Sequence, residues 1–157
     1  MSGKPAVLFV CLGNICRSPL AEAAFRHELA EAGLDIAVDS AGTSDWHIGE
    51  PPDPRAISTA LRYGIDIRSY RGRQVAPADF DRFTHIVALD DENLMALEAR
   101  QPRGSIAELS LLLDYVEGRE GESVADPYFG GVAGFEQTWA DVTAAARGLI
   151  KRLRSAS

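Results

Sequence analysis

The fold is decided near the start of the chain, by the stretch AVLFVCLGNICRSP at residues 6–19. Residues 6–11 are apolar without a break, which is typical of a strand buried on both faces of a parallel sheet. Ser18 and Pro19 follow as a helix start, because serine is a preferred N-cap and proline fits the first helical position. The stretch therefore predicts a buried strand, a tight turn and a helix in succession.

The rest of the 157-residue chain repeats this alternation of apolar runs and helical patterns. Further strands are predicted at residues 36–40, 84–89 and 107–113. Helices are predicted from Ser18 to Gly33, from the Asp53-Pro54 start to Gly64, from Asp90 or Asp91 to before Pro102, and over residues 135–153. Residues 41–52 and 114–134 are predicted loops. We therefore expect one α/β domain over residues 1–157, a four-stranded parallel sheet with right-handed crossovers and helices on both faces.

Composition narrows the class of protein. Hydrophobic residues make up 46% of the chain and charged residues 25%, which is usual for a globular domain. The formal net charge of -7, with no local basic stripe, argues against nucleic-acid binding. No stretch approaches the roughly 20 apolar residues of a membrane-spanning helix, and residues 6–12 lack a signal-peptide cleavage pattern. Cys11 and Cys16 alone cannot form a disulfide-rich scaffold. We expect a cytoplasmic protein that does not bind membranes.

The turn over residues 11–18 is where chemistry is expected, because ligands bind beyond the carboxyl ends of the strands in such sheets. Gly13 and Asn14 suit left-handed backbone, which lets successive amide groups turn inward. A ring of amides at a helix N-terminus binds anions, and Arg17 adds a planar fork that matches two phosphate oxygens. Cys11 would lie at the base of this ring, where the same positive surroundings stabilise a thiolate. The turn is predicted to be a phosphate-binding loop with a nucleophile at its floor.

Three motifs follow one another along the chain: VCLGNICRSPLAE at residues 10–22, SAGT with WHIGEP at residues 40–51, and DPYFG at residues 126–130. In order and spacing they resemble the low-molecular-weight protein tyrosine phosphatases, over nearly the whole chain. The resemblance implies hydrolysis of phosphotyrosine and aryl phosphates through a phosphocysteine intermediate, with no metal or other cofactor. It also implies phosphotyrosine-containing proteins as substrates and inorganic phosphate or similar oxyanions as ligands, in a monomer or weak dimer.

The resemblance implies four catalytic residues. Cys11 attacks phosphorus, while the loop amides and Arg17 hold the equatorial oxygens. Ser18 hydrogen-bonds the sulfur and eases its departure in the second step. Asp126 protonates the leaving phenol and then takes a proton from the attacking water; the plainer alternative is that Asp126 only forms a turn before Pro127.

The resemblance also implies residues that bind substrate and residues that support the loop. Substrate-binding residues are Gly13, Asn14 and Cys16 in the loop, and Leu12, Ile15, Trp46, Tyr128 and Phe129 at the entrance. Asn14 and Ser40 are expected to hold the loop backbone, and Tyr70 stands where many members have a supporting histidine. Cys16 either fills space beneath the loop or forms a reversible disulfide with Cys11. Trp46 either contacts substrate or only packs against the protein.

Other functions remain open at this point. Relatives that resemble protein arginine phosphatases have threonine in place of Ile15, so the aliphatic residue favours phosphotyrosine. An arsenate reductase of similar fold would need further cysteines, and none follows Cys16. A phosphotyrosine-binding module without activity would need Arg17 but gain nothing from Cys11 with Asp126. The histidines lack metal-ligand spacing, and we expect all of them to be structural or solvent-facing: His27, His47 and His85.

Overall fold

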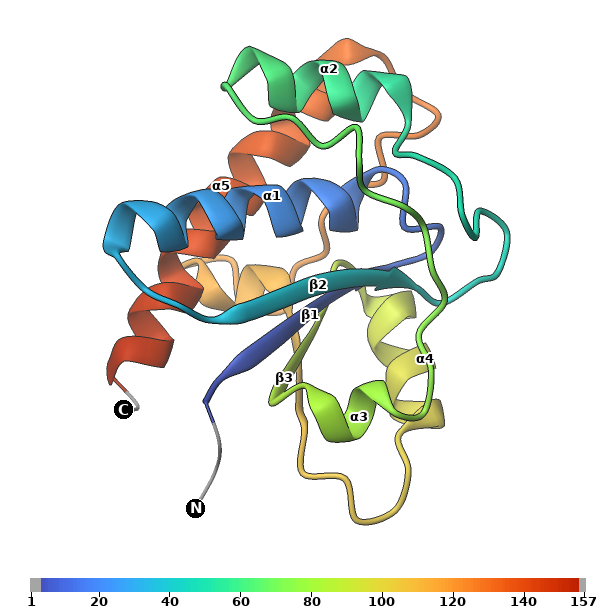
Figure 1. Ribbon diagram of the computed structural model, residues 1–157, viewed down its shortest axis with the longest axis vertical. Helices are drawn as coiled ribbons and strands as arrows, with labels where there is room; N and C mark the ends of the chain where they lie inside the picture. Colours follow the sequence, from blue (N-terminus) through green and yellow to red (C-terminus); the bar gives the residue numbers. More distant parts are fainter. Residues whose placement is uncertain (1–3, 156–157) are drawn as a thin grey trace.

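Four parallel strands form the centre of the computed structural model, which describes residues 4–155. The strands are β1 (Ala6–Cys11), β2 (Ala37–Gly42), β3 (His85–Ala88) and β4 (Glu108–Leu111). They lie in the order β2-β1-β3-β4, and every pairing is parallel. β1 therefore lies inside the sheet with a strand on each side (Figure 1). The predicted four-stranded parallel sheet is confirmed.

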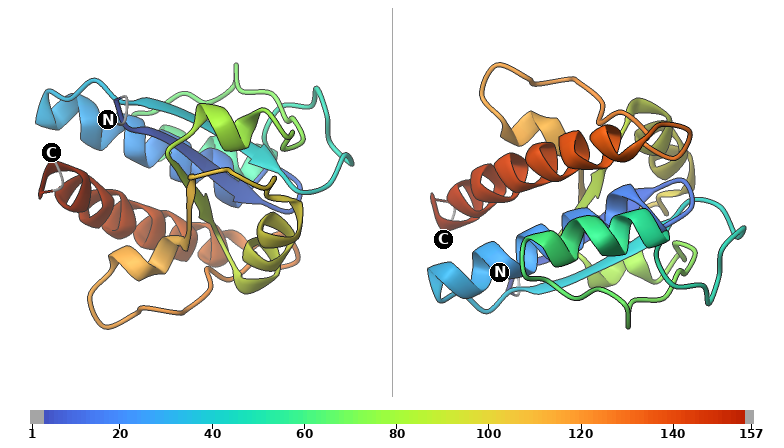
Figure 2. Two further views of the ribbon diagram at one scale, coloured as in Figure 1. Left: turned by 90° about the horizontal axis from the view of Figure 1, so that it is seen from below. Right: turned by 90° about the horizontal axis from the view of Figure 1, so that it is seen from above.

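Helices cover both faces of this sheet, as predicted (Figures 1 and 2). One face carries α1, α2 and α5, and the other carries α3 and α4. The helices are α1 (Arg17–Ala32), α2 (Pro54–Arg62), α3 (Asp79–Arg82), α4 (Asp91–Arg100), the 3-10 helix η1 (Leu112–Tyr115) and α5 (Val132–Ser155). No helix within residues 4–155 is both long and apolar enough to cross a bilayer.

β1 separates two apolar cores. Val7, Phe9 and Cys11 belong to the core beneath α1 and α5, whereas Leu8 and Val10 belong to the core on the α3 and α4 side. Because neighbouring side chains of a strand point to opposite faces, a strand buried on both faces needs an apolar residue at every position. This explains the unbroken apolar run at residues 6–11. The last residue of β1, Cys11, lies at the carboxyl end of the strand, where the loop begins.

Several boundaries differ from the prediction. β2 extends to Gly42, beyond the predicted end at residue 40, because it pairs with β1 as far as the Cys11–Gly42 register. The predicted strand 107–113 ends at Leu111, since the chain then turns into η1 and buries its leucines against α5. α5 begins at Val132, so the predicted 114–134 loop is shorter at both ends. The short helix α3 had no predicted counterpart.

Two helix starts agree with the sequence and one does not. The Asp53 side chain accepts a hydrogen bond from Arg55 N at the start of α2, and Asp90 caps α4 in the same way. α1 instead begins at Arg17 with Cys16 at the N-cap, and no side chain within the described residues caps it. The predicted Ser18 cap is wrong because the Ser18 hydroxyl lies 3.0 Å from the Cys11 sulfur. The first amides of α1 therefore stay available to the loop.

Candidate active site

The loop after β1 turns at Asn14, which has a φ of 59°. Asparagine tolerates this left-handed region better than other side chains, as the sequence predicted for this position. Gly13 does not share the conformation, because its φ is not positive. Its small size has another reason: a Cβ atom there would lie 3.0 Å from the His47 ring.

The Cys11 side chain lies at the floor of this loop and is only 3% exposed. The Asn14 backbone N–H points at its sulfur, with a nitrogen–sulfur distance of 3.3 Å. Asn14 Nδ2 also donates to Ser18 Oγ at 2.8 Å, which leaves the Ser18 hydroxyl hydrogen free to donate to the sulfur at 3.0 Å. Both groups are therefore placed to donate a hydrogen bond to the Cys11 sulfur.

A chain of buried side chains supports the loop behind Asn14. Arg73 N donates to Asn14 Oδ1 at 3.0 Å, and Asn14 Nδ2 donates to Ser40 Oγ at 3.1 Å. Ser40 Oγ in turn donates to Glu22 Oε1 at 2.7 Å. The structure thus brings the predicted pair Asn14 and Ser40 together.

Glu22 ends this chain, and the sequence analysis gave it no role. It accepts a hydrogen bond from Arg26 Nε at 2.9 Å as well as from Ser40. Burial raises the pKa of its carboxyl group in spite of these bonds. Tyr70 lines a small cavity together with Asn14, Ser40 and Glu22, and burial raises the pKa of its phenol to about 12, with Glu22 adding to the shift. Tyr70 therefore lies beside the supporting residues, as expected.

The SAGT motif at the end of β2 holds the first half of the loop. Thr43 N donates to Cys11 O at 2.9 Å, and Ser44 N donates to Leu12 O at 3.0 Å. Gly42 lies so close that a Cβ atom there would be 2.7 Å from Leu12 O. Only glycine allows this approach, which explains the SAGT motif.

Arg17 faces the loop from the first turn of α1 and is 3% exposed. Its Nη1 donates to Asp90 Oδ2 at 2.7 Å and to Val124 O at 2.9 Å. Its Nη2 lies 3.7 Å from Asp126 Oδ2. Asp90 thus has two functions, since it caps α4 and orients the guanidinium; the sequence analysis found only the first.

Asp126 lies opposite the loop, on the segment before α5, and its side chain is 40% exposed. Asp126 Oδ1 accepts a hydrogen bond from Tyr128 N at 3.0 Å, so Oδ2 is the oxygen nearer Arg17. Tyr128 and Phe129 follow directly, with ring centroids 4.9 Å apart in an edge-to-face pair. The turn expected from Asp126 is present, and it holds the carboxylate next to Arg17.

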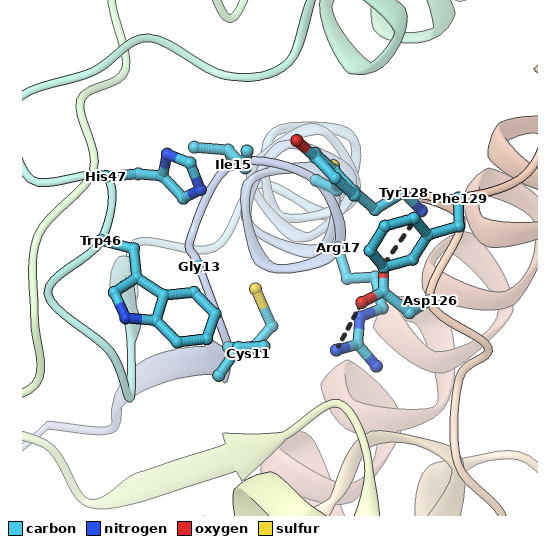
Figure 3. A pocket seen from close by; sticks show the side chains of 11 residues that line it. Cys11, Gly13, Ile15, Arg17, Trp46, His47, Asp126, Tyr128 and Phe129 are labelled. Carbon is cyan, nitrogen blue, oxygen red and sulfur yellow. Dashed lines mark hydrogen bonds and ion pairs between the residues drawn. The ribbon is translucent and has the colours of Figure 1, made fainter.

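These elements enclose one pocket of about 210 Å³. Figure 3 shows Cys11 between two walls, with Trp46 and His47 on one side and Asp126, Tyr128 and Phe129 on the other. The prediction that His47 is only structural or solvent-facing is therefore wrong, because its ring forms part of the pocket wall. Every residue predicted to be catalytic or to bind substrate lines the pocket except Asn14, at the turn of the loop, and Ser18, in the first turn of α1. The lining residues are Cys11, Leu12, Gly13, Ile15, Cys16, Arg17, Trp46, His47, Asp126, Tyr128 and Phe129.

The two cysteines differ in their surroundings, and both are free thiols. Burial raises the pKa of the Cys16 thiol, and the nearby Asp53 carboxylate raises it further. A neutral thiol is a poor nucleophile, so Cys16 is not activated for attack in this pocket. Within residues 4–155, no group of three or more His, Cys, Asp or Glu side chains could hold a metal ion.

A pocket with hydrogen-bond donors around its base, a buried arginine and a cysteine beneath them is suited to a cysteine-based phosphatase, because a phosphoryl dianion needs both donors and a nucleophile. The chain belongs to the low molecular weight phosphotyrosine protein phosphatase family, whose model matches residues 6–157. This confirms the resemblance seen in the sequence. The chain is accordingly a protein-tyrosine phosphatase, a hydrolase with phosphoproteins as substrates.

Two individual relatives agree with this assignment, and a third protein of the same fold is named for a different substrate. A protein of Schizosaccharomyces pombe, named low molecular weight phosphotyrosine protein phosphatase, is 39% identical over 156 residues, which cover 98% of this chain and 99% of the relative. A crystal structure of a protein tyrosine phosphatase from Entamoeba histolytica, with Hepes in the active site, has a TM-score of 0.92 at 34% identity and covers 98% of this chain and 99% of that one. A Drosophila arginine phosphatase has a TM-score of 0.87 at 34% identity, with coverage of 93% and 96%.

Proposed function

We propose that this phosphatase cleaves phosphotyrosine through a phosphocysteine formed on Cys11, with Asp126 as general acid and base and with no metal ion. The observation that carries the proposal is the shared pocket: the Cys11 sulfur, the Arg17 guanidinium and the Asp126 carboxyl group all line it. The proposed nucleophile, anion-binding guanidinium and general acid therefore share one cavity, and the Asn14 N–H and Ser18 hydroxyl contact the sulfur at its floor.

In the first step the Cys11 thiolate attacks phosphorus, and a sulfur–phosphorus bond forms as the bond to the phenol oxygen breaks. Protonated Asp126 gives its proton to the leaving phenolate. Arg17 and the loop amides neutralise charge on the three equatorial oxygens, the part of the chemistry on which phosphoryl transfer depends most. A general acid contributes about 10²–10⁴-fold, which is roughly 3–5 kcal/mol.

In the second step a water molecule attacks phosphorus, Asp126 takes its proton, and the sulfur–phosphorus bond breaks. The electron pair returns to the sulfur, where the Ser18 hydroxyl can donate a hydrogen bond to the new thiolate across 3.0 Å. The sulfur is the nearer of two acceptors for the hydroxyl hydrogen, since Ala41 O lies 3.5 Å from Ser18 Oγ. Ser18 thus lowers the barrier to departure of the sulfur.

The formal net charge of -7 does not prevent binding of a dianion. Exposed charges beyond the Debye length of about 8–10 Å are largely screened, whereas Arg17 and the amides act in contact with the phosphoryl group. The apolar wall of Trp46, Tyr128 and Phe129 supports an aromatic substrate, since rings stack well against such side chains.

The test is hydrolysis of p-nitrophenyl phosphate in EDTA. We expect wild-type activity in EDTA, none in Cys11→Ser, and about 10²–10⁴-fold loss of kcat/KM in Asp126→Asn. Asp66→Asn serves as a control, because among the described residues Asp66 pairs with exposed Arg68, away from the pocket. Full activity of Cys11→Ser, or complete loss of activity in EDTA, would contradict the proposal.

Phosphoarginine is the second candidate substrate, because the Drosophila arginine phosphatase shares the fold so closely. We propose phosphotyrosine as the better substrate, since Ile15 adds an aliphatic side chain to the pocket wall. The ratio of kcat/KM for phosphotyrosine to that for phosphoarginine should exceed one in the wild type and fall in Ile15→Thr. A wild-type ratio below one would reverse the assignment.

A further inference from the structure

Arg55, in the first turn of α2, reaches out of its helix into the segment that carries Asp126. Its Nη2 donates to Tyr128 O at 2.9 Å, and its Nη1 donates to Gly130 O at 3.0 Å. The guanidinium therefore binds two backbone carbonyls of the DPYFG motif, on either side of Phe129. This residue was not singled out by the sequence analysis.

The Arg55 guanidinium is itself held in place. Its Nε donates to Asp53 Oδ1 at 3.0 Å and its Nη2 to Asp53 Oδ2 at 2.9 Å, a fork that fixes its plane. The rings of Tyr128 and Phe135 flank it, with centroids 5.6 Å and 4.8 Å from Arg55 Cζ. Phe135 lies in α5 and is fully buried, so the Arg55 guanidinium packs against a ring that is fixed in the core.

The other end of this arrangement is the phosphate-binding loop. Asp53 N donates to Ile15 O at 2.8 Å, while the Asp53 carboxylate binds Arg55. A continuous path thus runs from Ile15 through Asp53 and Arg55 to Tyr128 O. It connects the loop that holds Cys11 to the segment that holds Asp126.

Few other hydrogen bonds attach the Asp126 segment to the described protein. Apart from Pro127, residues 125–131 are exposed. The bonds within the segment, from Tyr128 N to Asp126 and from Gly130 N to Pro127 O, shape it without fixing it to the protein. Among the described residues, the hydrogen bonds that reach residues 126–130 from other elements come from Arg55, and the Arg17–Asp126 pair is longer, at 3.7 Å.

We propose that Arg55 is a positioning residue for Asp126, holding the general acid at the correct distance from the leaving oxygen. The inference rests on the function proposed above for Asp126. Misplacement of a reacting group by about 1 Å can cost on the order of 10²-fold in rate. Loss of Arg55 should therefore mimic a partial loss of the acid, without loss of phosphate binding.

The experiment compares Arg55→Gln and Arg55→Lys with the matched control Arg62→Gln. Arg62 lies on the same helix and pairs with Glu136 of α5 at 2.6 Å, away from the Asp126 segment. Glutamine at position 55 preserves the α2 cap, because Asp53 Oδ1 accepts from the backbone N–H of residue 55. Values of kcat/KM are measured for phenyl phosphate and p-nitrophenyl phosphate, together with inhibition by inorganic phosphate and the melting temperature.

A poor leaving group needs the acid more than a good one, so the two substrates should respond differently. In Arg55→Gln we expect kcat/KM to fall about 10–100-fold for phenyl phosphate but only a few-fold for p-nitrophenyl phosphate. Inhibition by phosphate should change by less than about 2-fold, since Arg17 and the loop remain. Arg55→Lys should be intermediate, because an ammonium group lacks the fork that reaches both carbonyls, and Arg62→Gln should match the wild type.

Equal losses for the two substrates, or the same pattern in Arg62→Gln, would overturn the proposal in favour of a structural role. If Arg55→Gln does not fold, Arg55→Lys decides by the same ratio of substrates. In the Asp126→Asn background, Arg55→Gln should add less than about 2-fold, because the residue acts through Asp126. If Asp126→Asn loses activity and Arg55→Gln keeps full activity, this inference alone is refuted. If Asp126→Asn keeps full activity, the role proposed for Asp126 itself is refuted.

Discussion

Replacing Asn14 tests the support of the phosphate-binding loop most sharply. Its side chain makes three hydrogen bonds: buried ones to Ser18 Oγ and Ser40 Oγ, and a part-buried one from Arg73 N. Its backbone also has a φ of 59°, which alanine adopts only with strain. Asn14→Ala removes the bonds and adds this strain, whereas Asn14→Gly removes the bonds alone.

The expected magnitudes follow from these contacts. Each hydrogen bond contributes about 0.5–1.5 kcal/mol, so the three together contribute about 1.5–4.5 kcal/mol to the free energy of unfolding. Alanine in the left-handed region adds about 1–2 kcal/mol. We expect Asn14→Ala to be destabilised by about 3–6 kcal/mol, and Asn14→Gly to be more stable than Asn14→Ala by about 1 kcal/mol.

Urea denaturation measures both variants, and kcat/KM on p-nitrophenyl phosphate measures the loop. Both should lose at least about 10-fold in kcat/KM, because the Asn14 N–H and Ser18 no longer hold their positions beside the sulfur. Asn93→Ala is the matched control: Asn93 is a buried asparagine of α4 whose Oδ1 has no hydrogen-bond partner within the described residues. A stability and kcat/KM of Asn14→Ala equal to those of the control would refute the reasoning.

Three further outcomes are expected. Gly42→Ala should lower kcat/KM and cost about 1–3 kcal/mol in urea denaturation, since its Cβ would lie 2.7 Å from Leu12 O; unchanged values would mean the loop is not held there. Burial raises the pKa of Glu22 above its ordinary value of 4.5, so the native state binds the carboxyl proton more tightly than the unfolded chain does. The contribution of Glu22 to the free energy of unfolding therefore falls as pH rises from 4.5 through the raised pKa. Glu22→Gln should therefore gain in stability relative to the wild type as pH rises above the ordinary pKa of a glutamate, and a difference that stays constant with pH would contradict the burial argument. Trp46→Ala should raise KM for aryl phosphates about 2–10-fold with little change in melting temperature, because Trp46 is 65% exposed; an unchanged KM would mean that Trp46 only packs.

The local features of the fold could be predicted from the sequence. The apolar run of β1, the left-handed turn at Asn14 and the caps at Asp53 and Asp90 each depend on residues close together in the chain. The start of α1 could not be predicted in this way. Serine is a good N-cap by residue type, but the Ser18 hydroxyl contacts the Cys11 sulfur and Asn14 Nδ2 instead of a helix N–H. These contacts exist only once the loop has folded.

The functional residues that were missed act across long sequence separations. The role of Glu22 could have been suspected, because an acidic residue one turn after Ser18 lies on the buried side of α1 and needs a polar partner there. Asp90 follows β3, whose carboxyl end lies at the same sheet edge as Cys11, so its pairing with Arg17 could have been expected. Arg55 gave no such signal, since its contact with Tyr128 O depends on how α2 packs against α5.

Trapping of the intermediate tests the central claim most directly. Wild-type enzyme turning over p-nitrophenyl phosphate is quenched with denaturant, digested and analysed by mass spectrometry. The mechanism predicts one added phosphoryl group on the peptide that contains Cys11, located on that residue and not on Cys16, forming as fast as nitrophenol is released. Nitrophenol release with no phosphoryl group on Cys11 at any time during turnover would contradict it.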